Sequence, residues 1–551
     1  MDSGLLNSLQ AASNQRPKPA EYKPSYGTAG FRSKADHLSS TVFRCGVLMA
    51  LRSLKTCKTT GICITASHNP APDNGVKLVE GDGSMLLQEY EALADELANA
   101  VSSEALVDIV KRCIESEGIN LSGDGKVLLA YDTRPSGGAL AEDAAAGISS
   151  LGVAVEVLGV MTTPQLHWAV MRRNQNLDSS EEAYYRHIAD AFGVLTNDSN
   201  DSYSKKKTRT LHVDCANGVG ALKLDKLMPY VTPLGLDFRL YNVGEGVLNG
   251  DCGSDFVQKE KTLPETMRDI KDAHARMCAV DGDADRLVYF FPDANSKSST
   301  NTITLLDGDK IAALVAGLFT GLVSKLSSES DAKCNGNADL SKSTVGVVQT
   351  AYANGSSTRY LSETLNCEVV VTPTGVKHLH KAAHQFDIGI YFEANGHGTV
   401  LFKNSFLDAL RAHPSPAAAE ILALNDVINE AVGDAISDIL LVETALFKRG
   451  MDLPQWNALY DDLPSRQLKA EVPDRTAIVT EDAERRVARP KKLQEMIDAL
   501  VAEYPGGRSF VRPSGTEDIV RIYAEAVDER SAEELAERVR EAVINVLSSS
   551  P

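Results

Sequence analysis

The sequence has 551 residues, of which 43% are hydrophobic and 24% are charged, and its net charge at pH 7 is −19. These values are typical of a globular protein, exclude a largely disordered or fibrous chain, and leave room for about three or four domains. The negative charge argues against a nucleic-acid partner, because it repels a phosphate backbone. A small anionic ligand is still compatible with it, since a few local arginines or a metal ion outweigh the global field.

Short apolar runs that end in polar, glycine-containing loops predict β-strands, and segments with helical periodicity lie between them. The expected strands, in chain order, are 62–64, 127–131, 153–158, 211–214, 345–348, 369–371 and 388–392. The expected helices between them include 86–101, 309–326 and 416–449. This alternation predicts an α/β protein with mostly parallel sheets. Ligands of such sheets bind beyond the carboxyl ends of the strands, where the polar loops lie.

The last hundred residues differ from the rest and predict a small α+β domain. They contain expected strands at 467–478 and 519–525 and expected helices at 489–503 and 531–547. Three polar stretches, 197–208, 293–301 and 327–343, are expected to be loops or boundaries. No internal repeat is visible by sequence identity, although several strand–helix units could still share one structure.

We expect neither a membrane segment nor a secretory signal. The longest charge-free apolar stretch, 311–324, is shorter than the roughly 20 residues that a spanning helix needs. The first residues include an acid and lack a basic region. The nine cysteines are scattered and contain no Cys-x-x-Cys pair, which argues against a disulfide framework and a thiolate zinc site. Free thiols and a cytoplasmic protein are therefore expected.

The first candidate site is the segment 65–70, Thr-Ala-Ser-His-Asn-Pro, which follows a short strand. Ser67 at the end of a strand could act as a nucleophile. The segment is not Gly-x-Ser-x-Gly, so the strained turn of the hydrolases is not implied. Taken alone, a serine beside a histidine is more often an ordinary turn residue.

The second candidate is the segment 281–286, Asp-Gly-Asp-Ala-Asp-Arg. Three carboxylates at alternate positions repel one another unless a cation neutralises them, and oxygen ligands suit Mg²⁺ or Ca²⁺ better than zinc. An EF-hand is excluded, because the positions for its glycine and its glutamate are occupied by Arg286 and Pro292. An acidic surface turn is the alternative, but the apolar flanks on both sides favour a metal site.

The third candidate is the segment 512–518, Arg-Pro-Ser-Gly-Thr-Glu-Asp, with Arg521 in the strand that follows. A guanidinium, two hydroxyls and a glycine can together hold a phosphate group, although a polar turn between strands is the alternative. Two further loops could contact a ligand. In 393–399 a Glu and an Asn two residues apart can bind vicinal hydroxyls, and 373–378 offers a Thr, a Gly, a Lys and a His.

Two other patterns do not carry a function. His380 and His384 have zinc-binding spacing, but Lys381 stands where His-Glu-x-x-His requires glutamate, so they are interpreted as an ordinary helix face. The glycine-rich segments 216–220 and 244–250 match neither a dinucleotide-binding motif nor a P-loop. Nucleotide binding therefore has no support.

Taken together and in this order, the loops at Ser67, Asp281, Glu393 and Arg512 resemble those of the α-D-phosphohexomutase superfamily, as does the opening segment 26–32, Tyr-Gly-Thr-Ala-Gly-Phe-Arg. Within it, the chain looks most like the phosphoacetylglucosamine mutases. The features that distinguish this branch are 67–77 and the Glu-x-Asn-Gly-His-Gly form of the sugar loop, where glucose-type mutases tend to carry Glu-x-Ser. The resemblance extends from about residue 20 to about residue 545.

The resemblance implies a four-domain α/β architecture around a central cleft, with mixed sheets in three related domains. The implied bounds are 1–180 for the phosphoserine loop, 181–296 for the metal loop, 297–450 for the sugar loop and 451–551 for the smaller α+β domain with the phosphate loop.

The resemblance also implies the roles of individual residues. Ser67 would be a phosphoserine, and one Mg²⁺ would be held by its phosphate with Asp281, Asp283 and Asp285. His68, Lys77 and Arg32 would surround the transferring phosphoryl group, and which of them acts as acid or base stays open. The remaining residues would bind substrate: Arg286, Thr374, Gly375, Lys377, Glu393, Asn395, His397, Arg512, Ser514, Gly515, Thr516 and Arg521.

The implied reaction is the interconversion of N-acetylglucosamine 6-phosphate and 1-phosphate through a bound 1,6-bisphosphate, which feeds UDP-N-acetylglucosamine synthesis. A glucosamine-type 1,6-bisphosphate would be intermediate and activator, Mn²⁺ could replace Mg²⁺, and the protein would be a monomer or a homodimer. The alternatives are a glucose or mannose phosphate mutase, a phosphatase that uses Ser67, and a non-catalytic sugar-phosphate-binding protein.

Overall fold

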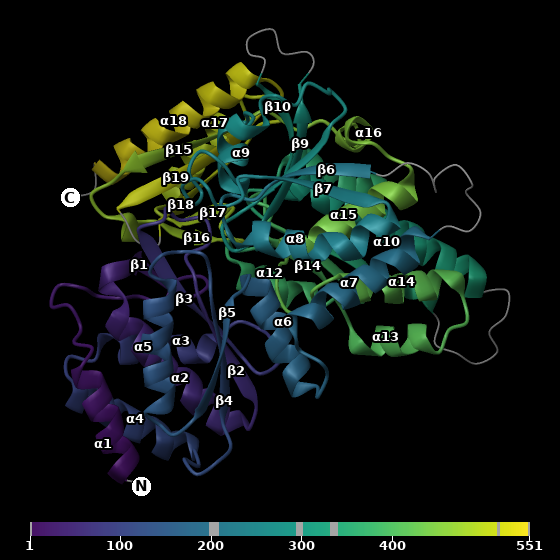
Figure 1. Cartoon of the computed structure of the whole chain (residues 1–551). Coiled ribbons are helices and arrows are strands. Elements are labelled where there is room, and N and C mark those ends of the chain that lie inside the picture. The colour runs from purple at the N-terminus through teal and green to yellow at the C-terminus, as the bar shows by residue number, and fades with distance from the viewer. Residues whose placement is uncertain (1–2, 198–208, 294–300, 331–339, 515–517, 549–551) are drawn as a thin grey trace. The chain divides into compact units, whose positions relative to one another are not determined.

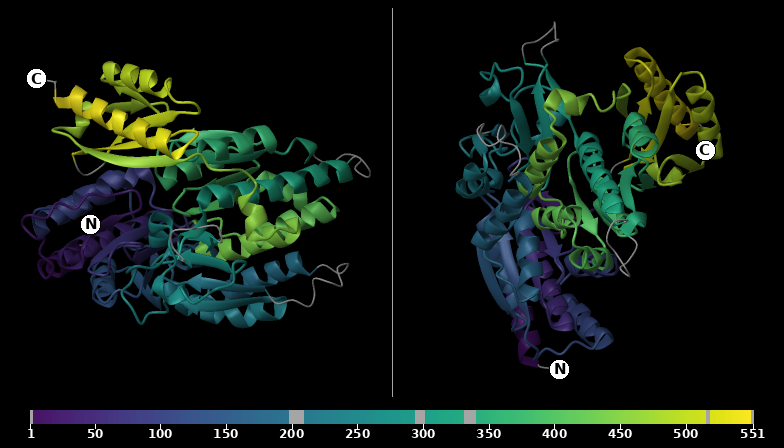
Figure 2. Two further views of the ribbon diagram at one scale, coloured as in Figure 1. Left: turned by 90° about the horizontal axis from the view of Figure 1, so that it is seen from above. Right: turned by 90° about the vertical axis from the view of Figure 1, so that its right-hand side faces the viewer.

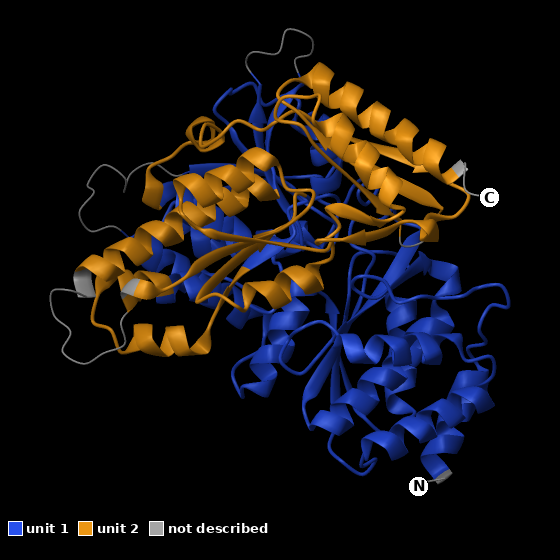
Figure 3. Cartoon of the chain, turned by 180° about the vertical axis from the view of Figure 1, so that it is seen from behind, with its two compact units in different colours: residues 1–307, 395–399, 422–447 blue, residues 308–394, 400–421, 448–551 orange. Residues whose placement is uncertain are grey.

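The computed structural model describes residues 3–197, 209–293, 301–330, 340–514 and 518–548 (Figure 1). The chain folds into two compact units, which Figure 3 shows in blue and orange. Unit 1 comprises 1–307, 395–399 and 422–447, and unit 2 comprises 308–394, 400–421 and 448–551. The chain passes between the units within three elements, namely β14 (Gly398–Phe402), α14 (Pro416–Val427) and α15 (Ala435–Arg449).

Unit 1 contains two five-stranded mixed sheets with one common plan. Three parallel strands are extended by two antiparallel ones, in the order β5-β4-β2-β3-β1 in the first sheet and β7-β6-β8-β9-β10 in the second. The strands are β1 (Phe31–Lys34), β2 (Thr59–Ile64), β3 (Asp73–Val79), β4 (Lys126–Tyr131), β5 (Ala154–Val160), β6 (Arg209–Asp214), β7 (Leu236–Tyr241), β8 (Arg276–Val280), β9 (Leu287–Pro292) and β10 (Ile303–Leu306).

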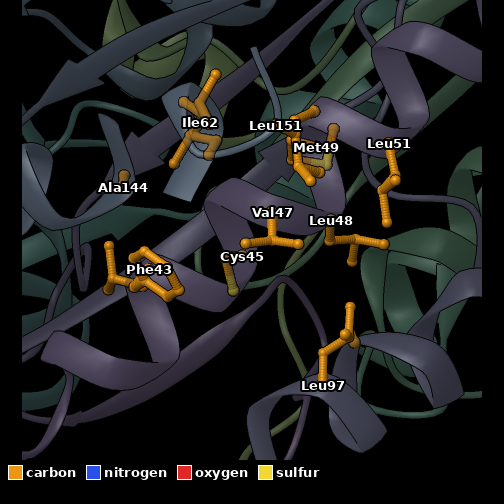
Figure 4. Packing of buried hydrophobic residues seen from close by; sticks show 14 of the residues in the cluster. Phe43, Cys45, Val47, Leu48, Met49, Leu51, Ile62, Leu97, Ala144 and Leu151 are labelled. Atoms are coloured by element: carbon orange, nitrogen blue, oxygen red, sulfur yellow. The ribbon is translucent and has the colours of Figure 1, made fainter. Parts of the chain in front are cut away.

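The core of the first sheet is closed by two helices that pack backbone to backbone. Gly46 lies in α2 and Gly147 in α5, and a Cβ on Gly147 would lie 2.0 Å from the carbonyl oxygen of Phe43, so only glycine permits this approach. Figure 4 shows the apolar side chains that fill the space around the crossing. The helices are α1 (Ser3–Asn14), α2 (Ser39–Thr56), α3 (Glu91–Asn99), α4 (Ser103–Glu117), α5 (Gly137–Ser149), α6 (Thr163–Asn174), α7 (Glu181–Thr196), α8 (Val219–Val231) and α9 (Ser254–Glu260).

Unit 2 contains the sheet β12-β11-β13-β14, in which β12, β11 and β13 are parallel, and a C-terminal antiparallel sheet β15-β19-β18. Helices α17 and α18 pack against the C-terminal sheet (Figure 2). The strands are β11 (Val345–Thr350), β12 (Glu368–Thr372), β13 (Ile388–Phe392), β15 (Ser465–Glu471), β16 (Val479–Glu481), β17 (Arg486–Arg489), β18 (Arg508–Pro513) and β19 (Ile519–Glu525). The helices are α10 (Gly308–Ser330), α11 (Gly355–Arg359), α12 (Val376–Ala383), α13 (Asn404–Arg411), α16 (Leu453–Asn457), α17 (Lys491–Val501) and α18 (Glu529–Ser548).

Helix α10 is longer than the apolar stretch expected from the sequence. By length and composition alone, its segment Gly308–Ser328 could cross a membrane. In the structure, 61% of that segment's most apolar window is buried, and the helix packs against β13 and β11. Burial inside unit 2 therefore accounts for its apolar composition.

The expected strands are all present, but four of the expected segments have wrong boundaries, namely two helices, one strand and one loop. The segment 416–449 is not one helix, because α14 ends at Val427 and α15 begins at Ala435. The strand expected at 467–478 ends at Glu471, and α10 continues to Ser330 into the loop expected from residue 327. Between 86 and 101 the α-helix covers only Glu91–Asn99. Of the expected loops, 198–208, 294–300 and 331–339 lie outside the described residues.

Three candidate loops occupy the same topological place. The loop with Ser67 joins β2 to β3, and the loop with Asp281 joins β8 to β9. In each of these sheets the loop follows the parallel strand that borders the two antiparallel strands. In the sheet of unit 2, β13, which precedes Glu393, is likewise the third of three adjacent parallel strands. Carboxyl ends of parallel strands present such loops to ligands. The three sheets therefore repeat one structural plan without repeating one sequence.

Candidate functional site

Ser67 sits just past the carboxyl end of β2 in a left-handed turn. Its φ is +50°, and its side chain is almost completely buried. Its hydroxyl lies 3.2 Å from Oδ2 of Asp283, and the Arg32 guanidinium donates to that hydroxyl at 3.3 Å. A non-glycine residue in this region is uncommon and costs of the order of 1 kcal/mol, so neighbouring contacts must hold it there.

The loop 281–286 is organised by its own first carboxylate. Oδ1 of Asp281 accepts from the backbone N–H groups of Asp285 at 3.0 Å and of Arg286 at 3.2 Å, and Ala284 takes a left-handed φ of +56°. This tight turn directs the three aspartate side chains toward one another. Candidate ligand atoms of Asp281, Asp283 and Asp285 all lie within 4.8 Å of one another, and all three residues are buried.

The carboxylate cluster fits a divalent cation. Oδ2 of Asp281, Oδ1 of Asp283 and Oδ1 of Asp285 are buried and have no hydrogen-bond partner among the described residues. A buried carboxylate oxygen without a partner is costly, and hard oxygen ligands of this kind suit Mg²⁺. Within the described chain, this is the one group of three or more acidic, histidine or cysteine residues that could hold a metal ion.

Lys77, on β3, neutralises part of the cluster. Its ammonium donates to Oδ2 of Asp283 at 2.8 Å and to Oδ2 of Asp285 at 2.7 Å. Burial alone would lower the pKa of Lys77, but these two carboxylates raise it above its ordinary value. In turn, Lys77, His397 and Arg286 hold the pKa of Asp285 well below its usual range despite burial. Burial and the other two aspartates raise the pKa of Asp281.

His68 and Arg286 lie at the edge of this cluster. Burial, with the charges of Arg286 and Arg32, lowers the pKa of His68 to about 3, so the imidazole is neutral near pH 7. The Nε of Arg286 lies 3.9 Å from Oδ1 of Asp285. The four predicted catalytic residues, which include Ser67, therefore lie together in unit 1 with the three predicted aspartate ligands and Arg286.

The predicted sugar loop is divided between the two units. His397 belongs to unit 1, and its Nδ1 lies 2.7 Å from the backbone oxygen of Asp285, so its buried ring faces the metal loop. Asn395, also in unit 1, accepts from the backbone N–H of His397 at 2.9 Å. Glu393 is half-buried at the end of β13 in unit 2.

In unit 2, Glu484 joins the two other predicted substrate-binding loops. One of its carboxylate oxygens accepts from Nε of Arg512 at 2.8 Å, and the other accepts from the hydroxyl of Thr374 at 2.6 Å and from its backbone N–H at 2.9 Å. Glu484 is the last of three consecutive residues with positive φ, in the turn between β16 and β17.

The two arginines of the predicted phosphate loop are directly opposite each other. Arg512 on β18 pairs with Arg521 on β19, so two positive charges face the same side of the hairpin. Like charges at such a position repel each other, and the carboxylate of Glu484 compensates the charge of Arg512. Ser514 closes the hairpin, because its backbone N–H donates to Ile519. Gly375 begins α12 with a φ of +130°, and Lys377 lies in its first turn. Gly515 and Thr516 lie outside the described residues.

Four residues near these loops were not predicted, namely Arg134, Thr163, Asn249 and Glu484. Thr163 donates to Oδ2 of Asp283 at 2.6 Å, and Asn249 and Arg134 contact the backbone of the Ser67 loop. Arg134 could have been singled out from the sequence, because it lies in the polar loop that follows β4. Asn249 lies in a glycine-rich segment that matches no motif, and Glu484 is visible only from its contacts.

Family models and curated proteins agree on the relationships of the chain. Residues 307–451 match domain III of phosphoacetylglucosamine mutase AMG1. Residues 468–542 and 46–180 match the C-terminal domain and domain I of the phosphoglucomutase/phosphomannomutase models. The phosphoacetylglucosamine mutase of Arabidopsis thaliana is 44% identical over 100% of both chains. The Homo sapiens protein of that name is also 44% identical, over 99% of this chain and 98% of its own.

Solved structures give the same result. The N-acetylphosphoglucosamine mutase of Aspergillus fumigatus superimposes with a TM-score of 0.91 at 41% identity, over 99% of each chain. A structure described as N-acetylglucosamine-phosphate mutase, a member of the α-D-phosphohexomutase superfamily, in the substrate complex gives a TM-score of 0.90 at 38% identity, over 98% of this chain and 99% of its own. The resemblance found in the sequence is thereby confirmed, and the chain belongs to the phosphoacetylglucosamine mutase family.

Proposed function

We propose that this chain interconverts N-acetylglucosamine 6-phosphate and N-acetylglucosamine 1-phosphate through a phosphoserine at Ser67. The observation that carries the proposal is the Ser67 hydroxyl, 3.2 Å from Asp283 inside the buried carboxylate cluster. The family supports the substrate, since the Aspergillus fumigatus relative has been solved with GlcNAc-6P and magnesium. In a cell, the 1-phosphate would feed UDP-N-acetylglucosamine synthesis.

The reaction would proceed by two transfers, each of which moves a different phosphoryl group. The bond between phosphorus and Oγ of Ser67 breaks and a bond forms to the free hydroxyl of the sugar phosphate. That hydroxyl would give its proton to a base, and Oγ of Ser67 would take up a proton from an acid. The product is a bound 1,6-bisphosphate, which turns end for end and returns its other phosphoryl group to Ser67. Phosphoryl transfer requires charge neutralisation and alignment more than covalent chemistry. Arg32 and Lys77 would supply positive charge, and with His68 they are the proton-handling groups near the serine.

The metal site would be built from Asp281, Asp283, Asp285 and the phosphate on Ser67. One Mg²⁺ bound there would neutralise negative charge on the transferring phosphoryl group. Lys77 already holds two of these carboxylates, so the chain itself fixes their orientation before any cation binds. Mn²⁺ suits the same oxygen ligands.

Substrate recognition would be shared among the remaining loops. Arg512, Ser514, Gly515, Thr516 and Arg521 would hold the phosphate that does not react, as charge-assisted donors do. Glu393 and Asn395 would bind sugar hydroxyls, with His397, Thr374, Gly375, Lys377 and Arg286 around them. We also retain the four domains 1–180, 181–296, 297–450 and 451–551 as a proposal, together with a monomer or homodimer and a cytoplasmic location. The eight cysteines that the structure describes are free thiols, which supports a reducing compartment.

Incubation with N-acetylglucosamine 1,6-bisphosphate and Mg²⁺ tests the phosphoserine. The protein should gain one phosphoryl group on the peptide that contains Ser67, measured by mass spectrometry, and Ser67→Ala should gain none. Glucose 1,6-bisphosphate serves as the comparison, because a variant of the Aspergillus fumigatus relative has been solved with it. Phosphorylation at another residue would refute the proposed nucleophile, and a strong preference for the glucose compound would replace the proposed substrate.

A further inference from the structure

We propose that Asn249 and Arg134 are positioning residues that hold the backbone of Ser67 in the conformation needed for phosphoryl transfer. This inference rests on the proposed function and adds two residues that do not touch the reacting atoms. It depends on a geometric coincidence in unit 1. Two side chains that lie far apart in the sequence donate hydrogen bonds to the same two carbonyl oxygens.

Those carbonyls belong to Ser67 and Asn69. Nδ2 of Asn249 donates to the oxygen of Ser67 at 2.9 Å and to that of Asn69 at 3.1 Å. NH2 of Arg134 donates to the same two oxygens at 3.0 Å and 2.9 Å. A carbonyl oxygen has two lone pairs, so each of the two oxygens is fully used. A flip of either peptide would break two hydrogen bonds at once.

Four of the five N–H groups of Arg134 donate to this loop. NH1 donates to the carbonyl oxygens of Pro70 at 2.7 Å and of Asp73 at 2.9 Å, and Nε donates to Asp132 at 3.0 Å. With the two bonds from NH2, every N–H of the guanidinium has an acceptor. The side chain is completely buried. Arg134 therefore serves to fix the path of the chain from Ser67 to Asp73.

The N–H side of Ser67 is held as well. Its backbone N–H donates to the hydroxyl of Thr65 at 3.0 Å, and that hydroxyl donates to Oδ2 of Asp132 at 2.7 Å. Oδ2 of Asp132 also accepts from Nε of Arg134. The hydrogen bonds from Arg134 thus reach both peptide groups of Ser67. This network can maintain the left-handed φ of +50°, which an isolated serine disfavours.

Asn249 is presented by a loop that is itself constrained. Oδ1 of Asn217 accepts from the backbone N–H groups of Gly244 and Gly246, each at 3.1 Å, and the N–H of Asn249 donates to Ala216 at 2.9 Å. Gly282 of the metal loop leaves the necessary space. A Cβ there would lie 2.6 Å from the oxygen of Ser67 and 2.9 Å from Nδ2 of Asn249.

The consequence for catalysis follows from alignment. The serine oxygen must leave and receive the phosphoryl group along one line, and displacements of about 1 Å can cost about 100-fold in rate. Without Asn249, each of the two carbonyls keeps one donor and the turn can relax. Both N–H groups of the Asn249 amide are used on this loop, so we expect the loss to fall on kcat and to leave KM unchanged.

The test compares Asn249→Ala with Val247→Ala, a matched control in the same loop whose side chain is 67% exposed. We expect kcat of Asn249→Ala to fall about 10- to 100-fold with KM within about twofold of wild type. Phosphorylation of Ser67 by the 1,6-bisphosphate should slow by the same factor. A crystal structure of Asn249→Ala should show Ser67 leaving the left-handed region. Val247→Ala should match wild type in all three measurements.

Two outcomes would overturn the inference: a kcat of Asn249→Ala equal to that of Val247→Ala, or a raised KM with an unchanged kcat. If Asn249→Ala does not fold, Asn249→Asp takes its place, because aspartate has the same shape and lacks the amide donor. Its kcat and KM are then compared with those of wild type and Val247→Ala in the same way. Failure of the proposed function is distinguishable, because then the wild-type protein itself would neither turn over nor acquire phosphate on Ser67. The Ser67 conformation in the variant structure tests the positioning role even in that case.

Discussion

The hydroxyl of Ser67 lies 3.2 Å from Oδ2 of Asp283, a residue 216 positions further along the chain. The same carboxylate oxygen accepts from Lys77 and Thr163, while its other oxygen has no hydrogen-bond partner among the described residues. Oδ2 of Asp283 therefore orders Ser67 and the ammonium of Lys77, and Oδ1 is left for a ligand. Through this contact the proposed nucleophile and the proposed metal loop meet, although they follow strands of two different sheets.

The carboxylate cluster should lower the free energy of unfolding of the protein until a cation binds. We predict that Asp281→Asn raises the melting temperature of the metal-free protein, because burial and the two neighbouring aspartates raise the pKa of Asp281. A gain of about 1 kcal/mol corresponds to about 1–3 °C in a protein of this size. Differential scanning calorimetry in EDTA and in Mg²⁺ provides the measurement.

In Mg²⁺ the order should reverse, since wild type gains stability from binding and Asp281→Asn gains little. Asp225→Asn, exposed on α8, is the control and should follow wild type in both conditions. A variant less stable than wild type in EDTA, or one stabilised equally by Mg²⁺, would contradict the proposed metal site.

Glu484 should compete with phosphate for Arg512. Its carboxylate accepts from Nε of Arg512 at 2.8 Å and from Thr374, so an anionic ligand must share or displace it. We predict that Glu484→Gln binds inorganic phosphate and sugar phosphates about 3- to 10-fold more tightly, because a neutral amide does not repel the ligand. Isothermal titration calorimetry measures this. Glu481→Gln, exposed on β16, should leave the affinity unchanged; weaker binding by Glu484→Gln would show instead that Glu484 orients Arg512.

His167 should make the fold sensitive to mild acid. It is fully buried beside the carbonyl oxygen of Gly83, 2.6 Å from Nδ1, and burial lowers its pKa to about 4. An unfolded histidine titrates near 6.5. Above that pH both states are neutral and no dependence arises. Between about pH 6.5 and pH 4 only the unfolded state binds the proton, so stability falls by up to about 1.4 kcal/mol per pH unit.

Urea unfolding at several pH values checks this behaviour. His167→Gln should have a flatter profile between about pH 6.5 and pH 4 than wild type, even if it is less stable at pH 7. His274→Gln, at an exposed position, should retain the wild-type slope. An unchanged slope in His167→Gln would show that this histidine is not the group that titrates.

The sequence allowed much of the fold to be predicted, because strand ends and polar loops are local features. The runs that became β4, β11 and β13 are apolar and short, and each ends where polar residues begin. The break between α14 and α15 was missed although its residues, 428–434, include Asn429, Gly433 and Asp434, which are typical of turns. Hydrophobic periodicity alone does not mark such a break.

In the candidate site, too, the residues in local motifs could be predicted, and the residues defined by long-range contacts could not. Ser67 and the aspartates of the metal loop stand in compact motifs, so they could be found from the sequence. Asn249 and Arg134 act on carbonyl oxygens of a distant loop, and any backbone offers such acceptors, so no side-chain pattern reveals the pair. Glu484 likewise lies half-buried in the turn between β16 and β17, and its role depends on contacts with two other loops. Contacts of this kind can be identified only when the three-dimensional structure is known.

The most direct test of the account is ³¹P NMR of N-acetylglucosamine 6-phosphate with Mg²⁺, a trace of its 1,6-bisphosphate, and either wild-type protein or Ser67→Ala. We predict that wild type replaces the 6-phosphate signal by that of the 1-phosphate, and does so faster than for glucose 6-phosphate. Ser67→Ala should fold and show no conversion. Conversion by Ser67→Ala, or release of inorganic phosphate by wild type in place of the 1-phosphate, would contradict a mutase that acts through Ser67.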